Sequence, residues 1–187
     1  GQVIRPQFWP EDLDYQDKTV VIIGSGATAM TLVPAMAKKA KQVTMLQRSP
    51  TYVLSRPSED WFANGLRKIM PSTWAYAVTR FRNTLFQEFL FKQARKYPAM
   101  AKRLLIHQLR KQLGKDYDVE KHFTPNYNPW DQRLCLVPDD DLFKAISSGS
   151  ATVVTDHIQR FTETGIELKS GQHLQADIVV SATGLEL

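Results

Sequence analysis

Apolar and polar residues are distributed along this chain in a way that separates strand-like from helix-like stretches. Residues 19–23 form a continuous apolar run, typical of a strand buried on both faces, and a helical pattern follows it. A second strand is expected over 41–49. The run 177–184 predicts another apolar strand, which returns to the same sheet and ends on a turn of small residues. This order predicts an α/β fold with a parallel sheet.

The middle of the chain has a different pattern. Residues 74–91 place aromatic residues and leucines at spacings of three and four, which predicts a helix with one wide apolar face. Pro98 should separate this helix from a second one over 99–113, which ends near Gly114. We interpret 58–114 as a helical insertion after the second strand.

The last third of the chain begins with a passage rich in proline and asparagine. Residues 115–150 are expected to form a structured loop segment with one short helix at 141–146. Short strands are then expected over 152–154, 157–161 and 166–168. We interpret these three strands as a small antiparallel β-meander.

A glycine-rich turn joins the first strand to the following helix. It has the pattern G-x-G-x-x-A and consists of Gly24, Ser25, Gly26, Ala27, Thr28 and Ala29. Gly24 permits a tight turn, Gly26 lets the backbone approach a pyrophosphate, and Ala29 lets the helix lie close to the strand. The pattern therefore predicts a dinucleotide-binding turn in a Rossmann-like domain. The alternative is a glycine-rich turn that closes a strand–helix corner without a ligand.

The end of the second strand indicates which nucleotide binds. Gln47, Arg48 and Ser49 stand where a site for NAD usually carries an acid for the ribose 2′-hydroxyl. An arginine can form a forked contact with a 2′-phosphate, and a serine can add a hydroxyl donor, so we expect NADP(H) to be preferred. The alternative is that Arg48 points into solvent.

Composition and charge limit the remaining possibilities. The 187 residues are 43% hydrophobic and 23% charged, as in an ordinary globular protein. The lone Cys135 excludes an internal disulfide, the four histidines are too far apart for a local zinc cluster, and no run is long enough for a membrane span. We therefore expect no metal site, and we expect the protein to be cytoplasmic. The chain begins with Gly1 and is expected to be a piece of a longer protein.

The net charge of +5 is unevenly distributed. Residues 67–115 contain twelve lysines and arginines and a single acid, Glu88. One alternative interpretation is therefore a module that binds nucleic acid or an anionic membrane surface. Nothing in the chain resembles a nucleic-acid motif, and an apolar face rich in phenylalanine is more simply explained by packing against the sheet or against another domain.

Several motifs together resemble the class B flavoprotein monooxygenases, which include the Baeyer–Villiger and flavin-containing monooxygenases. Gly1, Trp9 and Pro10 match the second half of the Baeyer–Villiger fingerprint, although Arg5 stands where the fingerprint has histidine. The glycine turn, the segment 47–50 and the closing 182–184 also resemble segments of that family. The likeness covers essentially the whole chain and is nearest the ethionamide-activating branch.

This resemblance implies an enzyme in which NADPH reduces FAD and the reduced flavin uses O2 to oxygenate a ketone or a soft heteroatom of a small organic substrate. The only glycine turn in these 187 residues is assigned to NADPH. Residues 1–17 would then be a hinge from a missing FAD domain, and 18–187 the NADP-binding domain, inactive without that partner. The alternative is a stand-alone NADP(H)-binding oxidoreductase or sensor.

The resemblance also implies roles for two further side chains. Arg133 would match the catalytic arginine, which stabilises an anionic peroxyflavin, and Gln132 replaces a lysine that normally helps to hold the 2′-phosphate. Arg133 has the alternative role of bracing the loop. Trp9 either contacts the cofactor by walling the pocket or packs the hinge.

Overall fold

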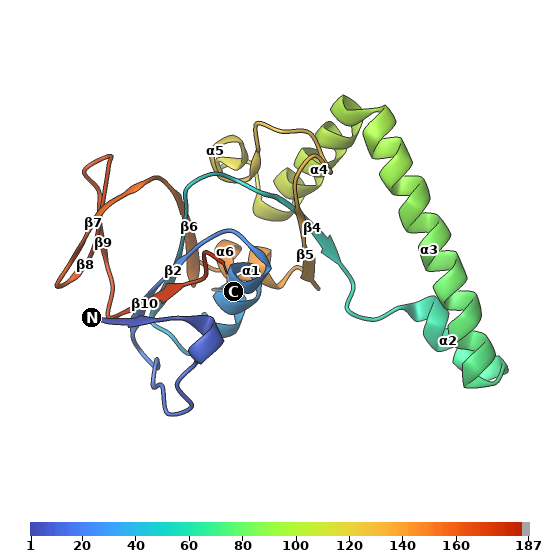
Figure 1. Cartoon of the computed structure of the whole chain (residues 1–187), viewed down its shortest axis with the longest axis horizontal. Helices are drawn as coiled ribbons and strands as arrows, with labels where there is room; N and C mark the ends of the chain where they lie inside the picture. Colours follow the sequence, from blue (N-terminus) through green and yellow to red (C-terminus); the bar gives the residue numbers. More distant parts are fainter. Residues whose placement is uncertain (185–187) are drawn as a thin grey trace.

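A five-stranded parallel sheet forms the centre of the molecule (Figure 1). The computed structural model describes residues 1–184. The strand order is β1 (Gln2–Ile4), β10 (Ile178–Ser181), β2 (Thr19–Ile23), β3 (Gln42–Gln47) and β6 (Ala151–Thr155). All four pairings are parallel, so the carboxyl ends of the strands meet at one edge. The predicted α/β class with a Rossmann-like sheet is confirmed.

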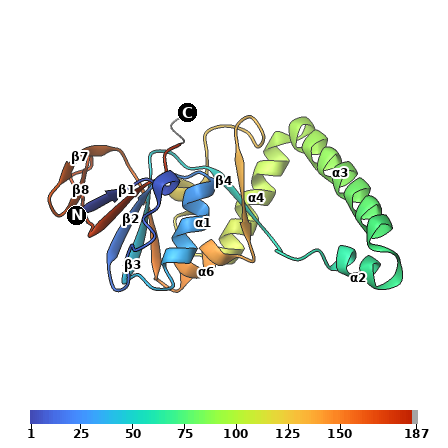
Figure 2. The same cartoon turned by 60° about the horizontal axis from the view of Figure 1, so that its bottom comes forward.

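Helices cover one face of this sheet (Figure 2). They are α1 (Ala27–Met36), α4 (Pro98–Leu113), α5 (Val119–Phe123) and α6 (Asp141–Ser147), and the short 3-10 helix η1 (Pro6–Phe8) follows β1. A separate parallel pair, β4 (Tyr52–Arg56) and β5 (Leu134–Pro138), lies beside them. Val20 and Ile22 point into this layer and join the main buried cluster with Phe123 and Phe143.

An antiparallel meander packs on the opposite face. Its strands are β7 (Ile158–Thr162), β8 (Gly165–Leu168) and β9 (His173–Gln175). Val21 and Leu46 point toward it and form a second cluster with Ile166 and Leu168. Because successive side chains of a strand point to opposite faces, the central strands need apolar residues at every position, which explains their continuous apolar runs.

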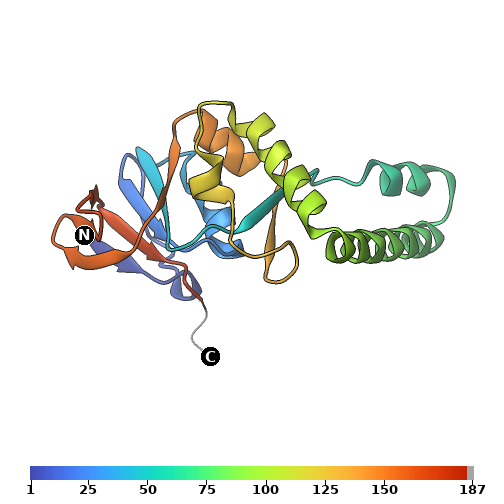
Figure 3. The ribbon, with the colours of Figure 1, turned by 90° about the horizontal axis from the view of Figure 1, so that it is seen from above.

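Two helices project from the body as an arm, which we define as residues 57–97 (Figure 3). It contains α2 (Trp61–Ile69) and α3 (Ser72–Lys96). The Asp60 side chain caps α2 by accepting hydrogen bonds from the backbone N–H groups of Phe62 and Ala63. Helix α3 packs against α2 and α4 rather than on the sheet. Of the two partners expected for its apolar face, the sheet is therefore wrong, and a missing FAD domain stays a prediction.

The structure corrects two further expectations. The strand expected over 152–154 is β6, which pairs with β3 in the parallel sheet, and the third strand of the meander is β9. Residues 115–150 are more than a loop with one helix, because they also contain α5 and β5. The reassigned strands, and β5 with its partner β4, arise from long-range pairing, which local turn composition does not reveal. The end of the expected domain, 185–187, lies outside the described residues.

The described residues, 1–184, bear on the expectations of no membrane span and no metal site. Within that range, no helix combines the length and the apolar composition needed to cross a membrane. The same residues contain no group of three or more histidine, cysteine, aspartate or glutamate side chains arranged to hold a metal ion.

Candidate functional site

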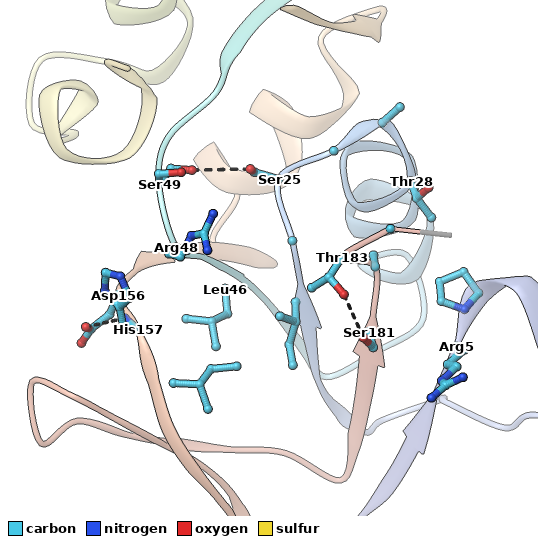
Figure 4. A pocket seen from close by; sticks show the side chains of 18 of the residues that line it. Arg5, Ser25, Thr28, Leu46, Arg48, Ser49, Asp156, His157, Ser181 and Thr183 are labelled. Carbon is cyan, nitrogen blue, oxygen red and sulfur yellow. Dashed lines mark hydrogen bonds between the residues drawn. The ribbon is translucent and has the colours of Figure 1, made fainter. Parts of the chain in front are cut away.

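A cleft of about 940 Å³ opens at the carboxyl edge of the parallel sheet (Figure 4). Every parallel strand contributes lining residues at or just after its carboxyl end. They are Arg5 after β1, 181–184 from β10, 24–28 after β2, Arg48 and Ser49 after β3, and 156–158 after β6. Open α/β sheets bind their ligands at this edge, because the loops and helix amino termini converge there.

The glycine turn forms the central wall of the cleft. Gly24 has φ +130°, and a Cβ atom there would lie 2.5 Å from the backbone oxygen of Ala182. Glycine is therefore required at this position by both conformation and space. A Cβ atom on Gly26 would lie 3.6 Å from Nη1 of Arg133 and would narrow the space between the turn and that guanidinium.

The turn presents backbone N–H groups to the cleft. Helix α1 begins at Ala27 directly after Gly26, and no side chain caps its first turn. The exposed N–H groups and the helix dipole favour an anion there. Ala27 and Thr28 line the cleft, whereas Ala29 is fully buried in the main core, where its small side chain lets the helix approach the sheet.

Ser25 holds the turn against the neighbouring segments. Its hydroxyl lies 3.0 Å from Oγ1 of Thr51 and donates to the backbone oxygen of Ser49 at 3.5 Å. Sγ of Cys135 lies 3.7 Å from the backbone oxygen of Ser25. Burial raises the pKa of the Cys135 thiol, which outweighs the opposing effect of Arg133, so this thiol is neutral and supports the turn by packing.

Arg48 and Ser49 line the cleft at the end of β3, and both are exposed (Figure 4). Within residues 1–184, Arg48 forms no ion pair. Gln47 is different. Its buried side chain points to the helical layer, where Nε2 donates to the backbone oxygen of His122 at 2.7 Å and to Oγ1 of Thr155 at 2.9 Å. The structure does not bring Gln47 together with the other predicted cofactor contacts.

Arg133 reaches the cleft from the loop before β5, whereas the neighbouring Gln132 does not line it. Trp9 is not among the lining residues either. It packs against the main core and borders a separate shallow hollow with Pro6 and Leu32. The structure thus places Trp9 where its packing interpretation expects it.

Three ionisable residues of the cleft have no counterpart in the sequence-based interpretation: Asp156, His157 and Lys169. Asp156 and His157 follow β6, and Lys169 follows β8. Assigning β6 to the parallel sheet would have located the first two, because residues after the carboxyl ends of parallel strands meet at one edge. No local signal marks Lys169, which reaches the cleft only because the meander folds back over the sheet.

A profile described as flavin-binding monooxygenase-like matches residues 1–187. The chain belongs to this family. It is 59% identical to the probable FAD-binding monooxygenase AlmA of Acinetobacter baylyi and 55% identical to the FAD-containing monooxygenase EthA of Mycobacterium tuberculosis. Both alignments cover the whole chain but only 38% of the relative, so the chain spans well under half the length of these proteins.

Solved structures with the same fold are also monooxygenases. A steroid monooxygenase bound to NADP superposes with a TM-score of 0.73 at 19% identity, over 98% of this chain and 42% of that one. OTEMO in complex with FAD and NADP gives 0.73 at 18% identity, over 100% and 42%. At this identity the likeness shows the fold alone.

Proposed function

We propose that the chain is the NADPH-binding domain of an FAD-dependent monooxygenase that oxygenates ketones or soft heteroatoms. The observation that carries the proposal is Arg48, an exposed cation without an ion-pair partner in the described part of the chain, at the end of the strand beside the glycine turn. Family membership favours this function over a stand-alone NADP(H) sensor and over a module that binds nucleic acid or a membrane surface.

The residues of the cleft fit NADPH. The uncapped start of α1 and the close backbone of Gly24 and Gly26 suit a pyrophosphate. Arg48 and Ser49 suit the 2′-phosphate through charge and a hydroxyl donor. When bound, NADPH supplies a hydride to FAD, which with O2 provides the oxygen transferred to the substrate. These side chains hold and orient the nucleotide, and the cofactors carry the chemistry.

Arg133 is proposed as the catalytic arginine. Its guanidinium lies beside Gly26 and lines the cleft. A cation there would stabilise negative charge that develops during oxygen transfer. Arg133→Ala should leave NADPH binding largely intact and lower the product formed per NADPH consumed. An unchanged product yield and turnover rate would leave Arg133 with a loop-bracing role only.

The proposed function also assigns the partners and the domain division. We infer that residues 1–17 form a hinge to an FAD-binding part of the same polypeptide, and that the described remainder is the nucleotide domain with its insertion at 58–114. A small organic substrate and O2 complete the reaction. A reducing cytoplasm fits the buried free thiol of Cys135.

The test of the NADPH assignment is the ratio of affinities for NADP⁺ and NAD⁺, measured by calorimetry on the full-length protein. Arg48→Ala should weaken NADP⁺ binding about tenfold or more while changing NAD⁺ binding little, because a charge-assisted contact with the 2′-phosphate is lost. Arg67→Ala, an exposed arginine of the arm, is the matched control and should change neither affinity. Equal affinities of the unmutated protein for both nucleotides would contradict the assignment.

A further inference from the structure

Lys169 is a charged residue of the cleft that the proposed function leaves without a role. It follows β8 at the turn that leads into β9 and lines the cleft. Its backbone N–H donates to the backbone oxygen of His157 at 2.9 Å, which fixes the start of the side chain beside the residue that follows β6. The lysine is exposed and, like Arg48, forms no ion pair among residues 1–184.

Arg48 and Lys169 line the same cleft. Arg48 directly follows Gln47, the last residue of β3, and Lys169 directly follows β8. Asp156 and His157, which also line the cleft, lie between these two segments in the pattern of backbone hydrogen bonds.

Backbone hydrogen bonds connect the segments that carry these two cations. The N–H group of Asp156 donates to the backbone oxygen of Gln47 at 3.0 Å, and His157 then accepts from Lys169. Two such backbone steps of about 4.8 Å each separate the two segments, and an extended lysine or arginine side chain is longer than one step. Both cations can therefore contact one anion at this corner of the cleft.

Asp156, the single acid among the described residues that line the cleft, is already engaged. The carboxylate of Asp156 accepts from the backbone N–H of His157 at 2.6 Å and from that of Ser170 at 3.2 Å. Hydrogen bonding lowers the pKa of Asp156, and the bond from the Ser170 side chain has a larger effect than the one from the His157 N–H. The carboxylate thus ties the turn after β6 to the turn that carries Lys169, and it leaves both cations available to a ligand.

We propose that Lys169 is the second cation of the 2′-phosphate site and, with Arg48, sets the preference for NADPH over NADH. This inference rests on the proposed function. A phosphate monoester carries more than one negative charge at neutral pH, so a second cation adds attraction that a single arginine does not supply. Gln132, which precedes Arg133, cannot be this second cation, because its side chain is neutral and does not line the cleft.

The test uses 2′,5′-ADP and 5′-AMP as probes, which differ only by the 2′-phosphate, with calorimetry on the full-length protein. Lys169→Gln should weaken binding of 2′,5′-ADP about fivefold and leave binding of 5′-AMP unchanged. Lys169→Arg should restore most of the loss. Lys41→Gln makes the same charge change at the opposite end of β3 and should alter neither affinity. Raising the salt concentration should shrink the Lys169→Gln effect.

The outcomes separate the two proposals. If the unmutated protein binds 2′,5′-ADP no more tightly than 5′-AMP, both the proposed function and the role of Lys169 are overturned. If it discriminates between the probes but Lys169→Gln behaves like Lys41→Gln, the proposed function stands and the assignment of Lys169 is wrong. An equal loss for both probes would likewise overturn it, because the lysine would then serve the adenosine or the fold.

Discussion

The sheet body and the helical arm use apolar residues in opposite ways. In the body they lie in two clusters, one on each face of the parallel sheet. In the arm, most of the large ones are exposed, including Trp61, Trp74, Phe81, Leu85 and Phe89. The last four fall at spacings of seven, four and four, so they form one stripe along α3. The body is thus held by its own core, whereas the stripe is suited to a surface outside residues 1–184.

The sharpest way to break this comparison is to truncate one phenylalanine from each region. Phe123 is 0% exposed beneath the sheet, and Phe81 is 68% exposed on the arm. Phe123→Ala should lower the free energy of unfolding by about 3–5 kcal/mol, because it leaves a cavity in the main core. Phe81→Ala should change the unfolding of the 187-residue chain by less than about 0.5 kcal/mol. Equal losses in urea unfolding would contradict the comparison.

A second prediction concerns the turn that shapes the cleft. Gly24→Ala should lower the free energy of unfolding by roughly 3 kcal/mol, because the added Cβ meets the Ala182 oxygen in a left-handed backbone conformation. Gly171 also has a positive φ, but nothing lies within 4 Å of an added Cβ. Gly171→Ala should therefore cost only about 1 kcal/mol. Thermal unfolding of the two variants measures this difference. Equal losses of stability would show that the close approach of the Ala182 oxygen to Gly24 does not matter.

A third prediction sharpens the contrast from the side of the arm. Gly65 lies inside α2, where an added Cβ would meet nothing within 4 Å. Gly65→Ala should stabilise α2 by about 0.5–1 kcal/mol, because alanine loses less backbone entropy than glycine in a helix. Hydrogen exchange of the α2 amides should slow, while exchange in β2 stays unchanged. Slower exchange in both would mean that the arm and the body unfold as one unit.

The smallest predicted effect is a dependence on pH confined to the body. Burial, followed by the charge of Lys121, lowers the pKa of His122, and Asp118 opposes them. The unfolded chain therefore binds a proton more readily than the folded one, so stability is complete above the ordinary pKa of 6.5 and falls as the pH drops below it.

Urea unfolding at pH 8 and at about pH 5.5 measures this loss. His122→Asn should remove part of the pH dependence, and His107→Asn, on the exposed side of α4, should keep it. The same pH dependence in both variants would show that His122 is not its source.

Much of the site could be predicted because its signals are local. The glycine turn and Arg48 depend on a strand, a turn and the next strand, whose order is fixed by neighbouring residues. The orientation of Gln47 could not be predicted in this way. All but the first residue of β3 are buried, so apolar periodicity does not tell which face of the sheet a side chain joins.

The parts that sequence reasoning missed depend on distant pairing. The residues 156–158 and Lys169 reach the cleft because β6 pairs with β3 across more than a hundred residues, and because the meander then covers the sheet. The arm shows the same limit in another form. The spacing in 74–91 predicted a helix, and α3 confirms it, but the spacing did not indicate what its apolar residues contact.

The most direct test of the central claim is hydrogen–deuterium exchange of the full-length protein with and without NADP⁺. The account predicts slower exchange in peptides that cover 24–30, 48–51 and 156–158, because their N–H groups line or adjoin the proposed nucleotide site. Peptides from α2 and α3 should exchange equally in both conditions. Protection confined to the arm, or no change around the glycine turn at saturating NADP⁺, would contradict the claim that this cleft binds the nucleotide.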